Sequence, residues 1–150
     1  MLEPIIKTLD VPCDPQKAFT VFVNEVNSWW PLDKNTVSAM GGQVAKRVVI
    51  EPSLNGKVYE IGHDDTEHLW GSVTRYEPFT AITLDWHIGL PPSSASSVEV
   101  TFTALDNGHT QVVLTHSRWE AFGDKAEEMR AGYDGGWVGV FEQAYRSAIT

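Results

Sequence analysis

The histidine at position 116 is the residue of this sequence whose surroundings best suit chemistry in a pocket. The segment "QVVLTHSRW" (111–119) alternates as a strand does, and if Val112 and Leu114 point inward, His116 points inward with them. An imidazole in an apolar pocket can orient a ligand carbonyl or carboxylate, or act as a general base. The alternative, and the commoner role, is a histidine satisfied by a partner on a strand or loop. We therefore take His116 as a candidate ligand-binding residue and leave the catalytic residues unknown.

A second group of chemically capable side chains lies in "HDDTEH" (63–68), where histidines, aspartates and a glutamate could all bind a metal. The segment falls in a predicted hairpin turn, where aspartate is favoured for its backbone conformation. We interpret it as a solvated turn and expect no metal site. No glycine-rich loop has the spacing of a nucleotide site, and we expect no cofactor.

The sequence does not place a general base beside a nucleophilic serine or cysteine. Ser117 adjoins His116, but neighbours on a strand point to opposite faces. Cys13 is the only cysteine, which excludes an internal disulfide and a multi-cysteine metal motif, and we expect an inert thiol. The sequence therefore carries no hydrolase signature.

The composition argues against several classes of partner. The 150 residues carry a net charge of −9, which repels nucleic-acid backbones and anionic lipids. No apolar run approaches the ~20 residues needed to cross a membrane, and the N-terminus lacks the features of a signal peptide. We therefore expect a cytoplasmic protein that binds neither nucleic acid nor membrane. Its six tryptophans suit a bulky core or a pocket wall.

The pattern along the chain predicts one domain over residues 1–150. A first strand at 5–11 precedes a helical segment in which Asp14 is the N-cap and Pro15 the first helical residue. About six antiparallel strands with short hairpin connections follow. We place them at 43–52, 57–62, 67–78, 80–89, 97–106 and 110–120. From about Lys125 the chain is helical again, and this helix must cover the apolar face of the sheet.

The predicted C-terminal helix carries glycines that should each weaken it by roughly 0.5–1 kcal/mol. Two explanations remain open. Gly135, Gly136 and Gly139 either allow a close approach to the sheet, or they mark a break after which Asp134 caps a shorter helix. Both leave Trp137 facing inward. The apolar stripe of the helix comprises Tyr133, Trp137, Val140, Phe141, Ala144 and Ala148.

An ordered set of short motifs resembles the START-like, or SRPBCC, superfamily, and most closely homologues of the heat-shock ATPase activator domain. The motifs are "DPQKAFTVFV", "WWP", "IEPSLNGKVYE", "WGSVTRYEP", "ITLDW", "LTHSRW" and "GGW". The resemblance covers nearly the whole chain and implies an α+β helix-grip fold. In that fold a curved six- to seven-stranded antiparallel sheet wraps around a long C-terminal helix, with short helices after the first strand. Members include lipid carriers, hormone-binding proteins, polyketide cyclases, dioxygenase subunits and co-chaperone domains, and they usually hold a cavity between sheet and helix.

Strand alternation and the resemblance together select the residues that should line such a cavity. The apolar face of "ITLDW" (82–86), which includes Trp86, should point inward. In "KVYEIG" periodicity alone turns Tyr59 inward, whereas the resemblance favours Glu60. A bulge at Gly71 or Gly62 would change which side chains of these strands point inward. The candidate ligand-binding residues are Trp30, Glu60, Trp86, Phe102, His116, Tyr133, Trp137 and Phe141.

Three functions remain open. The first is binding of a small, largely apolar or aromatic ligand in a closed cavity of roughly a few hundred cubic ångströms. The second is a cyclase- or aromatase-like enzyme in which His116 or Glu60 moves protons inside the cavity. The third is a co-chaperone-type protein-binding module with a packed core and an exposed apolar patch. A homodimer through an edge strand or a helix is compatible with the sequence, and no residue selects it.

Overall fold

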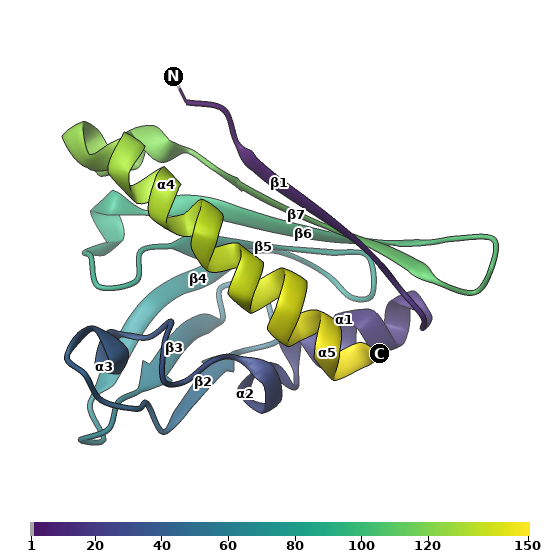
Figure 1. Ribbon diagram of the computed structural model, residues 1–150, viewed down its shortest axis with the longest axis horizontal. Coiled ribbons are helices and arrows are strands. Elements are labelled where there is room, and N and C mark those ends of the chain that lie inside the picture. Colours follow the sequence, from purple (N-terminus) through teal and green to yellow (C-terminus); the bar gives the residue numbers. More distant parts are fainter. Residues whose placement is uncertain (1) are drawn as a thin grey trace.

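The computed structural model describes residues 2–150, which form an antiparallel sheet, short helices after its first strand and a long C-terminal helical segment (Figure 1). The strands are β1 (Ile5–Val11), β2 (Arg47–Ile50), β3 (Lys57–Ile61), β4 (Glu67–Glu77), β5 (Ala81–Trp86), β6 (Ser96–Ala104) and β7 (Thr110–Ser117). The helices are α1 (Pro15–Val23), α2 (Val26–Trp29), α3 (Val37–Met40), α4 (Ala126–Trp137), the π-helical segment η3 (Val138–Tyr145) and α5 (Arg146–Ile149). Two 3-10 turns complete the set, η1 (Pro92–Ser94) and η2 (Trp119–Lys125).

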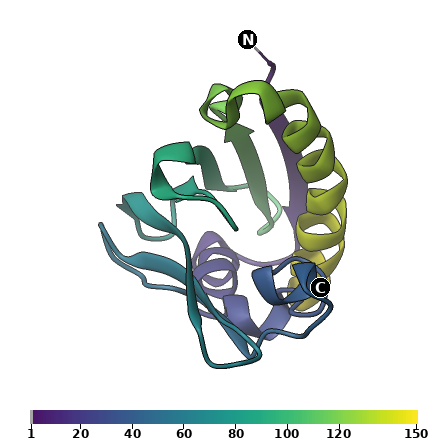
Figure 2. The same cartoon turned by 90° about the vertical axis from the view of Figure 1, so that its left-hand side faces the viewer.

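The sheet has seven strands within residues 2–150, in the order β1-β7-β6-β5-β4-β3-β2. Strands β2 to β7 pair with their neighbours in sequence, and β1 pairs with β7 at the far edge, all antiparallel. The long helical segment runs diagonally across the sheet, and the turned view shows the sheet curling around it (Figures 1 and 2). The arrangement confirms the α+β helix-grip fold that the resemblance implies.

A bulge in β4 contributes to this curvature. The register between β3 and β4 shifts so that Val58 pairs with Gly71 and Tyr59 with Leu69, which leaves Trp70 outside the ladder. A Cβ on Gly71 would lie 1.7 Å from the carbonyl oxygen of Asp85 on β5, so only glycine fits there. The bulge lets two consecutive residues, Trp70 and Gly71, both be buried.

Burial shows which strand faces point inward. Val112, Leu114 and His116 are all buried, as their alternation predicts. On β3 it is Glu60 that is buried, while Tyr59 is half-buried, so the phase favoured by the resemblance is correct and the phase favoured by periodicity is wrong. Periodicity fails here because the buried carboxylate is hydrogen-bonded, which offsets the cost of removing it from water.

The C-terminal segment is helical from Ala126 to Ile149, and the structure supports neither explanation for its glycines. Its backbone stays helical through Gly135 and Gly136, so there is no break for Asp134 to cap. A Cβ on Gly135 or Gly139 would meet no described atom of residues 2–150 within 4 Å, which excludes a close approach to the sheet there. Trp137 does face inward, as predicted.

The buried stripe of this segment departs from the prediction in its last two turns. Tyr145 and Ile149 are buried, whereas Ala148 is exposed. In an α-helix a four-residue spacing drifts by about 40° per step. The wider turn of the π-helical segment η3 counters that drift, so residues at four-residue intervals from Tyr133 to Ile149 stay on one face. The Tyr145 hydroxyl then donates a hydrogen bond of 2.7 Å to the carbonyl of Ala18 and ties the segment to α1.

Candidate functional site

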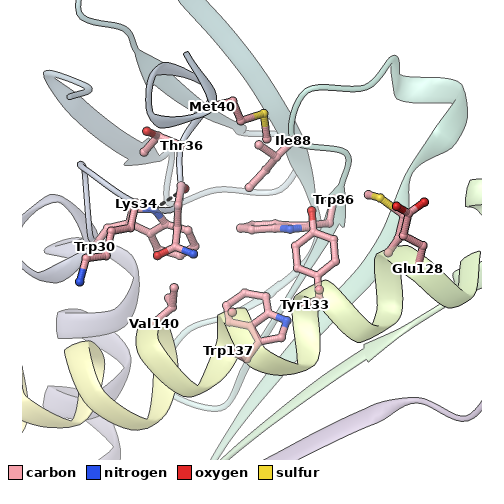
Figure 3. A pocket seen from close by; sticks show the side chains of 14 residues that line it. Trp30, Lys34, Thr36, Met40, Trp86, Ile88, Glu128, Tyr133, Trp137 and Val140 are labelled. Atoms are coloured by element: carbon pink, nitrogen blue, oxygen red, sulfur yellow. Dashed lines mark hydrogen bonds between the residues drawn. The ribbon is translucent and has the colours of Figure 1, made fainter. Parts of the chain in front are cut away.

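A pocket of about 270 Å³ opens between α4, the segment 30–40 and the end of β5 (Figure 3). Four aromatic side chains form much of its wall: Trp30, Trp86, Tyr133 and Trp137. Exposed side chains of Lys34, Met40 and Glu128 also border it. The volume is of the order expected from the sequence, but the pocket is open to solvent and is not the closed cavity that was expected.

The aromatic rings of the pocket hold one another in place. Trp86 has its ring centroid 5.9 Å from that of Trp30 and 5.7 Å from that of Trp137. Tyr133 stacks on Trp137 with centroids 6.4 Å apart and planes 26° apart. Behind them, the buried Trp70 packs on Trp30 and Trp86 at 5.2 and 5.8 Å. Because offset and edge-to-face contacts fix ring orientation, the aromatic wall is preformed.

Two glycines of α4 make room for the pocket. Gly132 and Gly136 both border it. A Cβ on Gly132 would meet no described atom within 4 Å, and one on Gly136 would approach only Asn35 Nδ2, at 3.8 Å. A larger side chain at either position would therefore occupy pocket space. This explains two of the glycines that weaken the helix.

Glu60 lies behind the pocket and holds α3 in place. Its fully buried carboxylate accepts hydrogen bonds from the backbone N–H groups of Val37 (2.7 Å) and Ser38 (2.9 Å). It also accepts from the Ser38 hydroxyl (2.7 Å) and from the Trp70 indole N–H (3.2 Å). A negative charge thus pairs with free N–H groups at the start of α3, which also suits the helix dipole. Because α3 carries Met40 to the pocket, Glu60 shapes the pocket without lining it.

His116 is one member of a buried hydrogen-bond chain. The Trp137 indole N–H donates to His116 Nδ1 at 3.0 Å, and His116 Nε2 lies 2.7 Å from Ser96 Oγ. An indole can only donate, so Nδ1 carries no proton and the neutral imidazole must carry its proton on Nε2. Nε2–H then donates to Ser96 Oγ, whose own proton goes to the carbonyl of Trp86 at 3.0 Å. When the histidine is neutral, every donor and acceptor in this hydrogen-bond chain has a partner; a protonated histidine would leave two N–H groups facing each other.

The surroundings of His116 hold it in this neutral form. Burial lowers its pKa to about 3. The ring of Trp119 lies 4.1 Å away and that of Tyr133 lies 4.7 Å away, centroid to centroid. Trp137 borders the pocket, and its indole N–H occupies one nitrogen of the histidine. The arrangement suits a structural histidine and leaves neither ring nitrogen available as a base towards a molecule in the pocket.

Tyr133 contributes the hydroxyl group of the aromatic wall. Burial raises the pKa of Tyr133 to about 12, although the neighbouring Trp86 N–H lowers that pKa by a smaller amount. The Tyr133 hydroxyl therefore stays protonated at neutral pH. The Trp86 indole N–H lies beside this hydroxyl without completing a hydrogen bond. Among residues 2–150 no other partner for that buried indole nitrogen is found. The pocket therefore contains a phenol and an incompletely paired indole donor side by side (Figure 3).

The predicted site residues divide into two equal groups. Trp30, Trp86, Tyr133 and Trp137 line the pocket. Glu60 and His116 instead make the structural hydrogen bonds described above. Phe102 packs on Phe19 with centroids 5.2 Å apart, and Phe141 stacks on Tyr145 at 5.6 Å, so both belong to the core.

Sequence reasoning missed the remaining lining residues. They are Lys34, Asn35, Thr36, Met40, Ile88, Glu128, Met129, Gly132, Gly136 and Val140. Helical spacing was a usable signal for some of them, since Met129, Gly132 and Gly136 lie three or four positions from Tyr133 or one turn from each other. The segment 34–40 carried no such signal, because its position depends on the long-range contact with Glu60.

Within residues 2–150, histidine, cysteine, aspartate and glutamate side chains do not gather in groups of three or more that could hold a metal ion. Among the helices of the same residues, none has the length and apolar character needed to span a membrane.

Comparisons with known proteins match almost the whole chain. The family model for Activator of Hsp90 ATPase homolog 1-like protein matches residues 12–143. The anthrahydroquino-Gama-pyrone synthase Txn09, solved as a complex with SUM, is 25% identical over 99% of this chain and 97% of that chain, with a TM-score of 0.66. CalC from Micromonospora echinospora, described as a self-sacrificing resistance protein, is 25% identical over 97% of this chain and 93% of that chain, with a TM-score of 0.72.

A third similar structure bears on the fold alone. The Aha1 dimer from Colwellia psychrerythraea is 15% identical over 99% of this chain and 96% of that chain, with a TM-score of 0.68. A search of curated proteins found no match.

Proposed function

Because the chain belongs to the family of Activator of Hsp90 ATPase homolog 1-like proteins, we propose that it binds a small, largely apolar or aromatic molecule in the pocket beside α4. The observation that carries the proposal is the meeting of four aromatic rings, from three separate parts of the chain, at one open pocket of about 270 Å³. Small-molecule sites are concave, mostly apolar and carry few polar groups.

The similar structures support ligand binding without naming this chain's ligand. The synthase that is 25% identical to this chain was solved as a complex with SUM, which supports a fold able to hold a bound molecule. The Aha1 structure was solved as a dimer, so sedimentation velocity of this chain should accompany any binding assay. Strands β1 and β2 are the sheet edges at which a homodimer could form.

The geometry favours binding over the cyclase-like alternative with His116 or Glu60 as the proton carrier. Both side chains are buried with hydrogen bonds that hold other parts of the protein, and the pocket lining does not include them. The co-chaperone-type alternative predicted a packed core without a pocket, and the pocket beside α4 counts against it.

The test uses two glycines of the same helix as a matched pair. Gly132→Leu places a side chain in the pocket, whereas Gly135→Leu places one on the exposed face of α4 outside the pocket lining. Both variants should gain helix stability of up to about 1 kcal/mol. Binding is followed by the fluorescence of a neutral aromatic probe without a carbonyl group, N-phenyl-1-naphthylamine.

We expect wild type and Gly135→Leu to bind the probe equally, and Gly132→Leu to bind it at least about tenfold more weakly, a loss of about 1.4 kcal/mol. Far-UV circular dichroism and thermal unfolding confirm that all three proteins are folded. Failure of the folded wild type to bind, or equal binding by Gly132→Leu, would refute the proposal.

A further inference from the structure

The wall of the pocket contains a directional polar feature that an apolar ligand alone would leave unused. Trp86 is only 3% exposed, and its indole nitrogen is buried without a hydrogen-bond partner among residues 2–150. An unpaired buried N–H is costly, so such groups are uncommon in folded proteins. In Figure 3 this indole lies beside the Tyr133 hydroxyl, which points away from α4.

The donor character of Trp86 leaves the phenolic proton of Tyr133 available to a ligand. The Trp86 N–H can only donate, so the Tyr133 oxygen can offer it only a lone pair. Tyr133 remains a protonated phenol at neutral pH, with its pKa raised to about 12 by burial. The phenolic proton is therefore left for another acceptor, and because Tyr133 and Trp86 both line the pocket, a bound molecule can supply that acceptor.

The surroundings select a neutral acceptor over an anion. The nearby wall consists of the rings of Trp30, Trp86 and Trp137, which cannot compensate a negative charge removed from water. The cationic side chain of the pocket, Lys34, is exposed and is accompanied by the exposed carboxylate of Glu128. A carbonyl oxygen costs far less to bury than a carboxylate and can accept the phenolic proton.

We infer that the ligand of this pocket is an aromatic compound with a neutral carbonyl group, whose oxygen accepts a hydrogen bond from the Tyr133 hydroxyl beside the Trp86 indole N–H. The inference rests on the proposed function and adds to it the chemical class of the ligand. The rings hold the aromatic part, and the Tyr133 hydroxyl sets the orientation of the ligand.

The test compares two probes that differ in one group. 2-Acetylnaphthalene has a carbonyl where 2-isopropenylnaphthalene has a CH₂ group of similar shape. Isothermal titration calorimetry measures both with wild type, Tyr133→Phe and Tyr59→Phe. The last variant is the control, because it removes the same hydroxyl from a half-buried tyrosine on β3, outside the pocket lining.

We expect wild type and Tyr59→Phe to bind the ketone about 2- to 10-fold more tightly than the alkene, the range for one neutral hydrogen bond. Tyr133→Phe should bind both probes with equal affinity. Trp86→Phe, which keeps a ring but loses the N–H, should reduce the ketone preference.

The outcomes separate this inference from the proposed function. Equal binding of ketone and alkene by wild type would overturn the carbonyl site and leave an apolar pocket. A ketone preference that survives in Tyr133→Phe would overturn the role of Tyr133. Absence of binding by either probe, together with no binding of the naphthalene fluorophore used above, would overturn both proposals.

Discussion

The neutral state of His116 should make the fold sensitive to acid over a definite range of pH. The folded protein holds this histidine with a pKa of about 3, whereas in the unfolded chain its pKa returns to about 6.5. Between these values the unfolded chain binds a proton that the folded protein does not. Stability from this group is therefore complete above about pH 6.5 and is lost as the pH falls.

The magnitude follows from the difference in pKa. At about 1.36 kcal/mol per pKa unit, the whole effect reaches about 5 kcal/mol once the pH is near 3. Between pH 7 and pH 5 the free energy of unfolding should fall by about 2 kcal/mol on account of His116 alone. Tyr133, its titratable neighbour in ring contact, stays protonated throughout this range.

The assay compares proteins in which other acid-sensitive groups are the same. His116→Gln cannot titrate but keeps one donor and one acceptor for Ser96 and Trp137. His63→Gln, in an exposed turn, controls for removal of a histidine. Urea unfolding at pH 7 and pH 5 gives the free energies, and unchanged denaturant slopes confirm comparable transitions.

We expect wild type and His63→Gln to lose about 2 kcal/mol more than His116→Gln between the two pH values. His116→Gln will be less stable at pH 7, so only the change with pH is compared. Equal losses in all three proteins, or an NMR titration that places the pKa of His116 near 6.5 in the folded protein, would refute the reasoning.

Two further substitutions test contacts that hold the pocket and its helix. Glu60→Gln exchanges a carboxylate that accepts four hydrogen bonds for an amide with its own N–H. We therefore expect the free energy of unfolding in urea to fall by about 2–4 kcal/mol and the backbone amides of Val37 and Ser38 to exchange hydrogen faster. Unchanged exchange at these two amides would contradict the role of Glu60. Tyr145→Phe removes the hydrogen bond to Ala18 while keeping the buried ring, and should cost about 1 kcal/mol, measured in the same way; a neutral result would mean that this bond does not stabilise the fold.

The helices and strands were predictable because their signals are local. Asp14 accepts a hydrogen bond from the Lys17 N–H and begins α1, as its position before Pro15 predicts. Alternation places His116 and Trp86 inward correctly, and the ordered motifs point to the helix-grip arrangement. Capping and alternation depend on residues close together in sequence, which is why the sequence alone suffices for them. The helix-grip arrangement, in contrast, is what the family resemblance implied.

The site was only half predictable because its other determinants are long-range. Glu60 is buried by groups on α3, more than twenty positions away, and periodicity cannot register them. The glycines suggested tight packing or a break, yet Gly132 and Gly136 border open space. Nothing in their local sequence distinguishes a glycine that admits a neighbouring backbone from one that leaves room for a ligand.

The aromatic packing also has an optical consequence. Five tryptophans form one connected group, with neighbouring ring centroids 5.2 to 6.2 Å apart: Trp29, Trp30, Trp70, Trp86 and Trp137. Trp119 joins them through the rings of His116 and Tyr133. At such separations excitation energy migrates between indoles before emission. The intrinsic fluorescence therefore reports on the group as a whole, so a quencher that reaches Trp86 or Trp137 alone should dim most of the protein's emission.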